Sequence, residues 1–251
     1  MDLSSYCLIL DSGIGGLSIA SAINWINYVY FADSKHAPYG RRSKSWLSQR
    51  IHFLIRYFYL KKIRIFLLAC NTLTTLFIDE LRLQYTDSIF VGTVPPVKSL
   101  KSLRGPSVIL ASSKTSKSDY LNNMIRYFAR DKKVQKLAST DLVEAIEKGD
   151  CLQINKRLSM LDPYKGKIQN LVLGCTHFSL IKNKIQQKLP NSRIIDPNEG
   201  VLRQLRKISY NSNIHQTRRI FYTSGNTLTT RKAAELFLSG SYLFKDFKHE
   251  D

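Results

Sequence analysis

The sequence predicts an α/β fold made of two pseudo-symmetric domains with mostly parallel sheets. Apolar runs of strand length alternate along the chain with helix patterns, as they do when helices connect parallel strands. Two of the apolar runs end alike, at residues 65–72 (IFLLACNT) and 170–177 (NLVLGCTH), each in a cysteine that precedes a new helix pattern. A chain of 251 residues is long enough for two α/β domains with buried cores.

The charge balance favours an anionic partner. Lys and Arg number 38 against 19 Asp and Glu, which gives a formal net charge of +19. Such a charge can attract anionic substrates, nucleic acid or a membrane surface. Because the basic residues are spread along the chain, we interpret them as the solvated surface of an enzyme with anionic substrates. Binding of nucleic acid is the less favoured interpretation and stays open.

Features of membrane, secreted and metal-binding proteins are missing from the sequence. It contains no run of eighteen apolar residues, and residues 1–5 lack the basic region of a secretion signal. We therefore expect a cytoplasmic protein without a membrane partner. The four cysteines are scattered and form no C-x-x-C pair, which argues against disulfides and structural zinc. Cys70 and Cys175 are expected to be free thiols.

The first half is predicted to alternate strands and helices. Strands are predicted at residues 6–10, 28–32, 64–69 and 88–92, and helices at residues 17–25, 43–61 and 73–84. The strands are short apolar runs, whereas the helix over 43–61 repeats its apolar residues with a period of 3.6. A glycine-rich turn at residues 11–17 (DSGIGGL) follows the first strand.

The second half restarts with the same rhythm after the prolines at residues 95 and 96. Strands are predicted at residues 107–111, 134–138, 171–173, 193–195 and 219–223, and helices at residues 118–129, 142–148, 152–161, 179–189, 201–209 and 228–238. Residues 112–117 are predicted as a polar turn, and the last residues as a solvated tail.

The spacing of the cysteines indicates an internal repeat. Asp11 precedes Cys70 by 59 residues, and Ser112 precedes Cys175 by 63. Ligands of parallel sheets bind at the carboxyl ends of the strands. Two similar halves that face each other through these ends would place the two cysteines on opposite walls of one cleft, which we predict as the active site.

Five motifs carry a resemblance to a known family. They are residues 11–18 (DSGIGGLS), 38–40 (PYG), 69–72 (ACNT), 92–97 (GTVPPV) and 173–177 (LGCTH). In their order and approximate spacing, over about residues 6 to 240, the chain resembles the glutamate racemases of the aspartate/glutamate racemase superfamily. The resemblance implies interconversion of L- and D-glutamate without a cofactor, as a source of D-glutamate for peptidoglycan. It also implies that the C-terminal segment returns to the first domain, which would comprise residues 1–95 and about 208–251, with residues 96–207 as the second.

Racemisation gives a reason for two thiols. One base cannot easily reach both faces of an α-carbon, so two acid/base groups are needed. The ordinary pKa of a thiol, about 8.5, allows one thiolate and one thiol near neutral pH, and a helix N-terminus favours the thiolate. The alternative, that Cys70 and Cys175 are ordinary buried thiols, does not account for the small polar residues after each of them.

By the resemblance, Cys70 deprotonates one enantiomer and Cys175 the other. Asp11 would assist Cys70, and His177 would assist Cys175. Glu147 resembles a further catalytic glutamate near the second cysteine, but it fits a helix-surface carboxylate equally well. His177 can also be a structural side chain. Two ligands at i and i+2 do not make a zinc site, so we expect no metal.

The substrate would be a small zwitterion with one extra carboxylate, and its anionic groups need N–H and hydroxyl donors. The candidate substrate-binding residues are Asp11, Ser12, Tyr39, Gly40, Asn71, Thr72, Ser112, Thr115, Thr176 and His177. The sequence departs from the family at Lys114, where a glycine is expected, and this leaves side-chain selectivity open. The sequence does not indicate whether cell-wall precursors regulate the protein. Aspartate racemisation on the same scaffold is the runner-up. A homodimer is one option for the oligomeric state.

Two further alternatives differ in class. Gly13, Gly15 and Gly16 could open a dinucleotide-binding domain with Asp33 as the ribose-binding acid. However, Ser18 stands at the third glycine, and the cysteine motifs stay unexplained. The other alternative is a non-catalytic basic protein that binds nucleic acid or an acidic partner, which two intact thiols disfavour.

Overall fold

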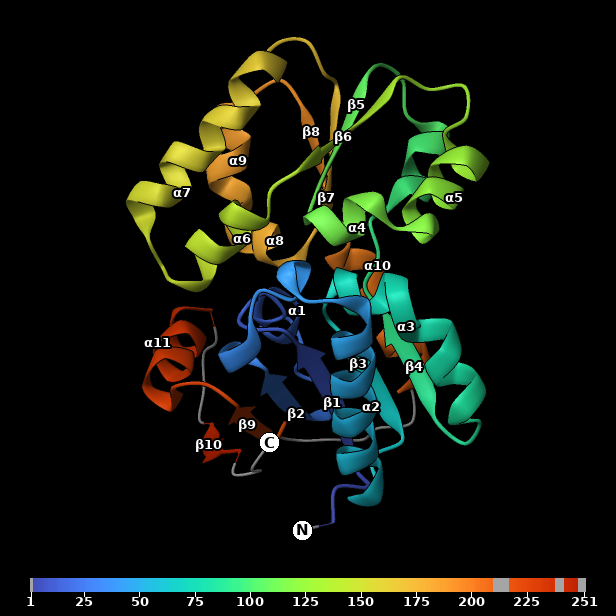
Figure 1. Ribbon diagram of the computed structural model, residues 1–251, viewed down its shortest axis with the longest axis vertical. Coiled ribbons are helices and arrows are strands. Elements are labelled where there is room, and N and C mark those ends of the chain that lie inside the picture. The colour runs from blue at the N-terminus through green and yellow to red at the C-terminus, as the bar shows by residue number, and fades with distance from the viewer. Residues whose placement is uncertain (1, 210–216, 238–241, 248–251) are drawn as a thin grey trace.

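The computed structural model describes residues 2–209, 217–237 and 242–247, and it contains two β-sheets flanked by helices (Figure 1). The first sheet has six strands in the order β10-β9-β2-β1-β3-β4, and the second has four in the order β6-β5-β7-β8. All strand pairs of the described residues are parallel. The predicted α/β fold with parallel sheets is confirmed.

The strands lie where apolar runs occur in the sequence. The first sheet contains β1 (Tyr6–Asp11), β2 (Asn27–Ala32), β3 (Ile65–Leu68), β4 (Ile89–Gly92), β9 (Arg219–Thr223) and β10 (Leu243–Asp246). The second contains β5 (Ser107–Ala111), β6 (Val134–Ala138), β7 (Asn170–Gly174) and β8 (Arg193–Ile195). The central strands β1, β5 and β7 are buried throughout, because apolar clusters pack on both faces of each sheet.

Helices and 3₁₀ turns connect the strands. The α-helices are α1 (Leu17–Ala20), α2 (Lys44–Leu60), α3 (Asn71–Gln84), α4 (Ser113–Lys117), α5 (Asp119–Phe128), α6 (Thr140–Glu147), α7 (Cys151–Leu158), α8 (Thr176–Leu180), α9 (Lys182–Lys188), α10 (Asn198–Ile208) and α11 (Thr227–Phe237). The 3₁₀ turns are η1 (Ser34–His36), η2 (Tyr39–Arg41), η3 (Val97–Ser102) and η4 (Ser159–Tyr164). Within the described ranges, the helices are too short or too polar to span a bilayer.

The strand order repeats between the two sheets. The series β2-β1-β3-β4 in the first sheet corresponds to β6-β5-β7-β8 in the second, and β9 and β10 extend the first sheet beyond β2. In this correspondence β1 matches β5 and β3 matches β7. Asp11 and Ser112 therefore end or follow one pair of matching strands, and Cys70 and Cys175 follow the other. The pseudo-symmetry expected from the spacing is present in the topology.

Several predicted elements differ in the structure. The helix predicted to reach residue 25 ends at Ala20, because the following turns bury Ile23 and Ile26 beneath the sheet. The predicted polar turn at residues 112–117 is instead the short helix α4 (Ser113–Lys117), which the side chain of Ser112 caps at its N-terminus. The supposed tail contributes β10, which pairs with β9. The predicted last residue of the 228–238 helix lies outside the described residues.

The packing of α10 bears on the division into domains. The predicted division placed this helix in the second domain, up to about residue 207. In the structure Val201 and Leu205 of α10 belong to the apolar cluster of the first sheet, together with Leu17 and Phe221. We therefore propose that the chain returns to the first domain near Pro197, immediately before α10, rather than near residue 208.

The burial pattern of α2 generates a stability prediction. Leu54 is fully buried in the first-sheet core, whereas Leu60, in the last position of the same helix, is 70% exposed. We expect Leu54→Ala to lower the free energy of unfolding by about 2–5 kcal/mol through lost burial and a residual cavity. Leu60→Ala should change it by less than about 0.5 kcal/mol. Urea denaturation followed by circular dichroism measures both, and equal losses would contradict the described packing of α2.

Candidate active site

The carboxyl ends of the central strands bring most of the predicted site residues together. Asp11 is the last residue of β1, and Cys70 follows shortly after β3. Ser112 and Cys175 lie just beyond β5 and β7 in the other sheet. The two edges touch, because the hydroxyls of Thr72 and Ser112 are 3.0 Å apart. Figure 1 shows α4 and α8 of the second domain at this junction.

Cys70 lies in a buried and electronegative environment. It occupies the N-cap position of α3, is 6% exposed, and has its Sγ 3.9 Å from the Ser12 hydroxyl. Burial, assisted by the negative charge of Asp11, raises the pKa of the Cys70 thiol to about 12. Near neutral pH Cys70 is therefore a protonated thiol that can donate a proton.

Cys175 has different neighbours. It occupies the N-cap position of α8, with its Sγ 3.7 Å from His177 Nδ1. The other ring nitrogen, Nε2, lies 2.7 Å from Glu147 Oε2. Glu147 is only 14% exposed in its side chain, so its interpretation as a helix-surface carboxylate is wrong. The three groups form a chain through which a proton can move to or from the sulfur.

The pKa shifts of His177 and Glu147 agree with an ion pair. Burial by itself lowers the pKa of His177, but the contacts with Cys175 and Glu147 outweigh it and raise this pKa well above its ordinary value. Burial raises the pKa of Glu147, but the bond from His177 outweighs it and lowers this pKa. An imidazolium and a carboxylate therefore face each other next to the second cysteine.

Asp11 and Asn71 keep polar atoms unsatisfied in the buried site. Asp11 Oδ2 accepts a 2.7 Å hydrogen bond from the Gly16 N–H, but Oδ1 has no partner among the described residues. Both amide atoms of Asn71 likewise lack a partner in the described part of the chain. Buried polar groups are normally paired, so these atoms are available to a bound molecule. Burial also raises the pKa of Asp11 to about 6, despite the nearby charge of His177.

The candidate hydroxyls form a cluster across the two domains. Thr72 of α3 lies within 3.3 Å of Thr115 as well as near Ser112, and the latter two are 3.1 Å apart. Thr176, at the start of α8, is 1% exposed. Gly40 approaches the second domain, since a Cβ at this position would lie 3.2 Å from Thr140. These hydroxyls are placed to donate to an anionic group.

The side chains of Tyr39 and Asp33 are hydrogen-bonded to each other. The Tyr39 hydroxyl donates to Asp33, so only the backbone of Tyr39 is left to contact a ligand. Asp33 also accepts two hydrogen bonds from the Arg50 guanidinium, at 2.9 and 2.7 Å. Burial raises the pKa of Asp33, but the bonds from His36 and Arg50 outweigh it and lower this pKa. A buried carboxylate engaged in this way does not fit the ribose-binding role of the dinucleotide alternative.

Two residues that connect the domains near the site were not predicted from the sequence. Ser34 donates its hydroxyl to Glu147 Oε1 at 3.2 Å. Arg41 pairs with two carboxylates of α6 across the domains, at 2.7 and 2.9 Å. The sequence contained a signal for Ser34. Ser34 follows the carboxylate that comes just after β2, as Ser12 follows the carboxylate at the end of β1. No comparable signal marks Arg41.

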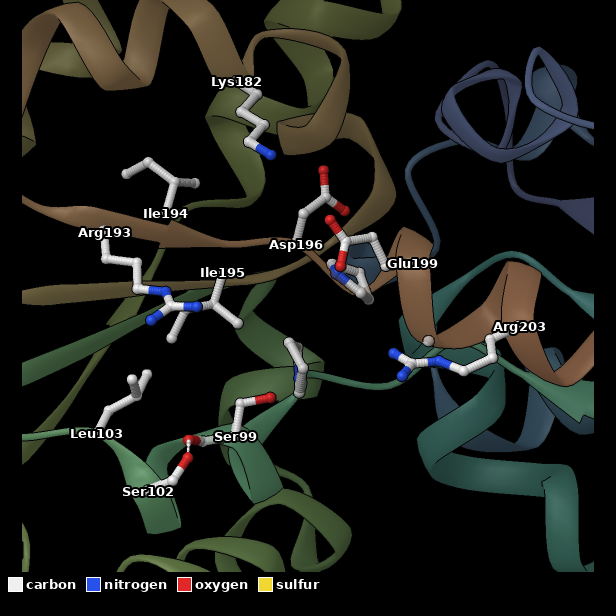
Figure 2. Close-up of a pocket in the computed structure, with 13 residues that line it drawn as sticks. Ser99, Ser102, Leu103, Lys182, Arg193, Ile194, Ile195, Asp196, Glu199 and Arg203 are labelled. Carbon is white, nitrogen blue, oxygen red and sulfur yellow. Dashed lines mark hydrogen bonds between the residues drawn. The ribbon is translucent and has the colours of Figure 1, made fainter.

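A separate cavity of about 380 Å³ lies where the chain crosses between the domains. Its lining includes Pro96, after β4, and Pro197, before α10. Figure 2 shows Arg193 and Arg203 on different sides of it, with Asp196 and Glu199 also in the lining. None of the predicted site residues lines this cavity, so it is distinct from the cysteine site.

Comparisons with known proteins agree with these features. The family model described as Asp/Glu/Hydantoin racemase matches residues 21–205. A glutamate racemase of Vibrio cholerae is 35% identical over 211 residues, which cover 80% of this chain and 79% of the relative. Among solved structures, a glutamate racemase of Bacillus anthracis superposes with a TM-score of 0.86 at 21% identity, over 98% of both chains.

A solved structure with a ligand is also similar. The glutamate racemase of Francisella tularensis in complex with D-glutamate has a TM-score of 0.85 and 22% identity, and 98% of both chains are covered. The resemblance inferred from five sequence motifs is thus confirmed at the level of sequence and of fold. The chain belongs to the Asp/Glu/Hydantoin racemase family, and relatives found by sequence within it are glutamate racemases.

Proposed function

We propose that this protein interconverts L- and D-glutamate by two-base proton transfer at the α-carbon, without a cofactor. The observation that carries the proposal is the pair of buried thiols at the N-caps of α3 and α8, one in each domain, at strand ends that meet. Each thiol has its own acid/base neighbours, Asp11 for Cys70 and His177 for Cys175. D-Glutamate made in this way would serve peptidoglycan synthesis.

The proposed step moves one proton off and one proton onto the α-carbon. One cysteine, as thiolate, takes the α-proton, and the electrons of the C–H bond stay on the α-carbon as a carbanion. The other cysteine, as thiol, gives its proton to the opposite face, and the electrons of its S–H bond stay on sulfur. After turnover the two sulfurs have exchanged protonation states. Asp11 and the His177–Glu147 pair can then relay protons to restore them.

The unsatisfied atoms suit an amino-acid substrate. The free Oδ1 of Asp11 can accept from an α-ammonium group, and the Asn71 amide can donate to an α-carboxylate. The hydroxyls of Thr72, Ser112 and Thr115 remain for a second carboxylate. This arrangement supports a dicarboxylic amino acid, and glutamate is favoured by the similarity to glutamate racemases. Aspartate remains the competing substrate.

Replacing either site cysteine is expected to abolish racemisation. Cys70→Ser and Cys175→Ser should each lower kcat on L-glutamate by about 10²–10⁴-fold, because a hydroxyl is a much weaker acid/base group than a thiol. Loss of circular dichroism of L-glutamate in heavy water, with deuterium at the α-carbon read by mass spectrometry, measures the reaction.

Matched controls decide how this experiment is interpreted. Cys151→Ser removes an exposed thiol that lies outside the site and should leave the rate unchanged. L-Aspartate is assayed in parallel with every variant. Activity confined to aspartate would keep the mechanism and change the substrate. Full activity in either site variant would contradict the two-thiol proposal.

Asp11→Asn is expected to stabilise the protein above pH 6 while lowering its activity on the order of 10²-fold. The pKa of Asp11, about 6, lies above the ordinary value of 3.8, so the folded state binds this proton more tightly than the unfolded state. That stabilisation is complete below about pH 4 and is lost as the pH rises through 6.

The advantage of the Asp11→Asn variant over the wild type should therefore grow from about pH 4 to about pH 6 and then level off, at no more than ~3 kcal/mol. The asparagine carbonyl can still accept from Gly16, so the fold is kept. Urea denaturation of both proteins between pH 4 and 8 measures the difference. A difference that does not depend on pH would show that Asp11 does not titrate in this range.

A further inference from the structure

The carboxylate of Glu147 joins the two domains at the second cysteine. Its Oε2 accepts a 3.0 Å hydrogen bond from the Ile14 N–H, and its Oε1 accepts a 3.2 Å bond from the Ser34 hydroxyl. Both donors come from turns that follow strands of the first sheet, whereas Glu147 ends α6 beside the second sheet. The same Oε2 contacts His177 Nε2 at 2.7 Å. One carboxylate thus has donors from both domains.

Gly13 makes room for this carboxylate. A Cβ at position 13 would lie 2.2 Å from both oxygens of Glu147, far inside van der Waals contact. The absence of a side chain at this point of the glycine-rich turn lets the carboxylate reach the Ile14 N–H. Gly13, Ile14 and Ser34 together form a seat for Glu147 on the surface of the first domain, which we call the Glu147 seat.

We propose that Ser34 is a positioning residue of the second acid/base group. With the other members of the Glu147 seat, it fixes the carboxylate against His177, so that residues of the first domain complete the proton chain of Cys175. This inference rests on the proposed racemase function and extends it to the hydrogen bonds that the first domain gives to the second acid/base group.

The bond from Ser34 to Glu147 affects proton transfer at one cysteine only. The terminal torsion of a glutamate side chain is broad, so a carboxylate that loses its hydrogen-bond donors can rotate away from the imidazole. Cys70 does not share this dependence, because its neighbours Ser12 and Asp11 lie in the same domain as Cys70 itself. Loss of the Ser34 hydroxyl should therefore slow proton transfer at Cys175 and leave transfer at Cys70 unaffected.

Isotope effects can reveal such a one-sided defect. L- and D-glutamate have equal free energies, so kcat/KM must remain equal for the two enantiomers in any variant. Ser34→Ala should lower kcat by about tenfold, as expected for a lost hydrogen bond to a charged group. With substrates deuterated at the α-carbon, the isotope effect on kcat/KM should rise for the enantiomer that Cys175 deprotonates. It should fall for the other enantiomer, for which return of a proton from Cys175 becomes limiting.

Three further variants separate positioning from general damage. Ser34→Thr keeps a hydroxyl and should restore the wild-type isotope effects. Gly13→Ala displaces the carboxylate from a different element and should reproduce the opposite shifts of Ser34→Ala. Arg41→Gln removes another contact between the domains without touching Glu147 or His177, and its two isotope effects should not diverge. Circular dichroism checks that each variant is folded.

The outcomes distinguish the positioning role from the function on which it rests. Racemisation by the wild type, with isotope effects in Ser34→Ala that are unchanged or that move in the same direction for both enantiomers, would overturn the positioning role alone. The same divergence in Arg41→Gln would also overturn it, because loss of any contact between the domains would then suffice. Absence of wild-type racemisation of glutamate would overturn the proposed function and the positioning role together.

Discussion

The contact of the two domains at the site depends on the carboxylate of Glu147, which bonds His177 Nε2 at 2.7 Å within its own domain and accepts hydrogen bonds from the other. A buried imidazolium and carboxylate are stable only if their geometry is good and their remaining polar atoms are paired. For Glu147 that pairing comes from the Ile14 N–H and the Ser34 hydroxyl of the first domain. The buried ion pair of the second domain therefore obtains its remaining hydrogen bonds from the first domain. The same residues belong to the domain interface and to the candidate site.

The repeated strand order explains the positions of the thiols but not their properties. Matching strands β3 and β7 place Cys70 and Cys175 at equivalent helix N-caps. Their neighbours differ, since a carboxylate lies near the first and an imidazole near the second. Proton transfer across an α-carbon needs one group that holds a proton and one that lacks it. A symmetric scaffold with asymmetric neighbours suits the proposed two-thiol mechanism, because the repeated strand order places a thiol in each domain and the surroundings of the two thiols differ.

The sequence predicted what depends on local pattern and missed what depends on contacts between distant segments. Strand runs and the period of α2 were sufficient to predict most elements, but β10 forms only because β9 offers a sheet edge. The position of Glu147 at a helix end was compatible with a surface or a catalytic role. Only the approach of α6 to Gly13, more than a hundred positions away in sequence, shows that this side chain is largely buried. Asp33 likewise fitted a ligand-binding acid in the sequence. Its bonds to Arg50 depend on how the helix that carries Arg50 lies against the sheet, which the local pattern does not show.

The unpaired atoms of the site show how a substrate with both charges can be selected by a strongly basic protein. A buried carboxyl such as Asp11, with an unpaired oxygen and a raised pKa, opposes folding. The Asn71 amide, also unpaired, adds to that cost. An α-ammonium group next to an α-carboxylate can satisfy both, whereas a simple anion would leave the Asp11 oxygen unpaired. Recognition at the α-carbon therefore needs matched polar partners rather than net positive charge. Under the proposed function, discrimination between glutamate and aspartate comes from the far end of the substrate, for which we propose Ser112, the N-cap of α4, and Thr115, next to Lys114 on α4, as partners.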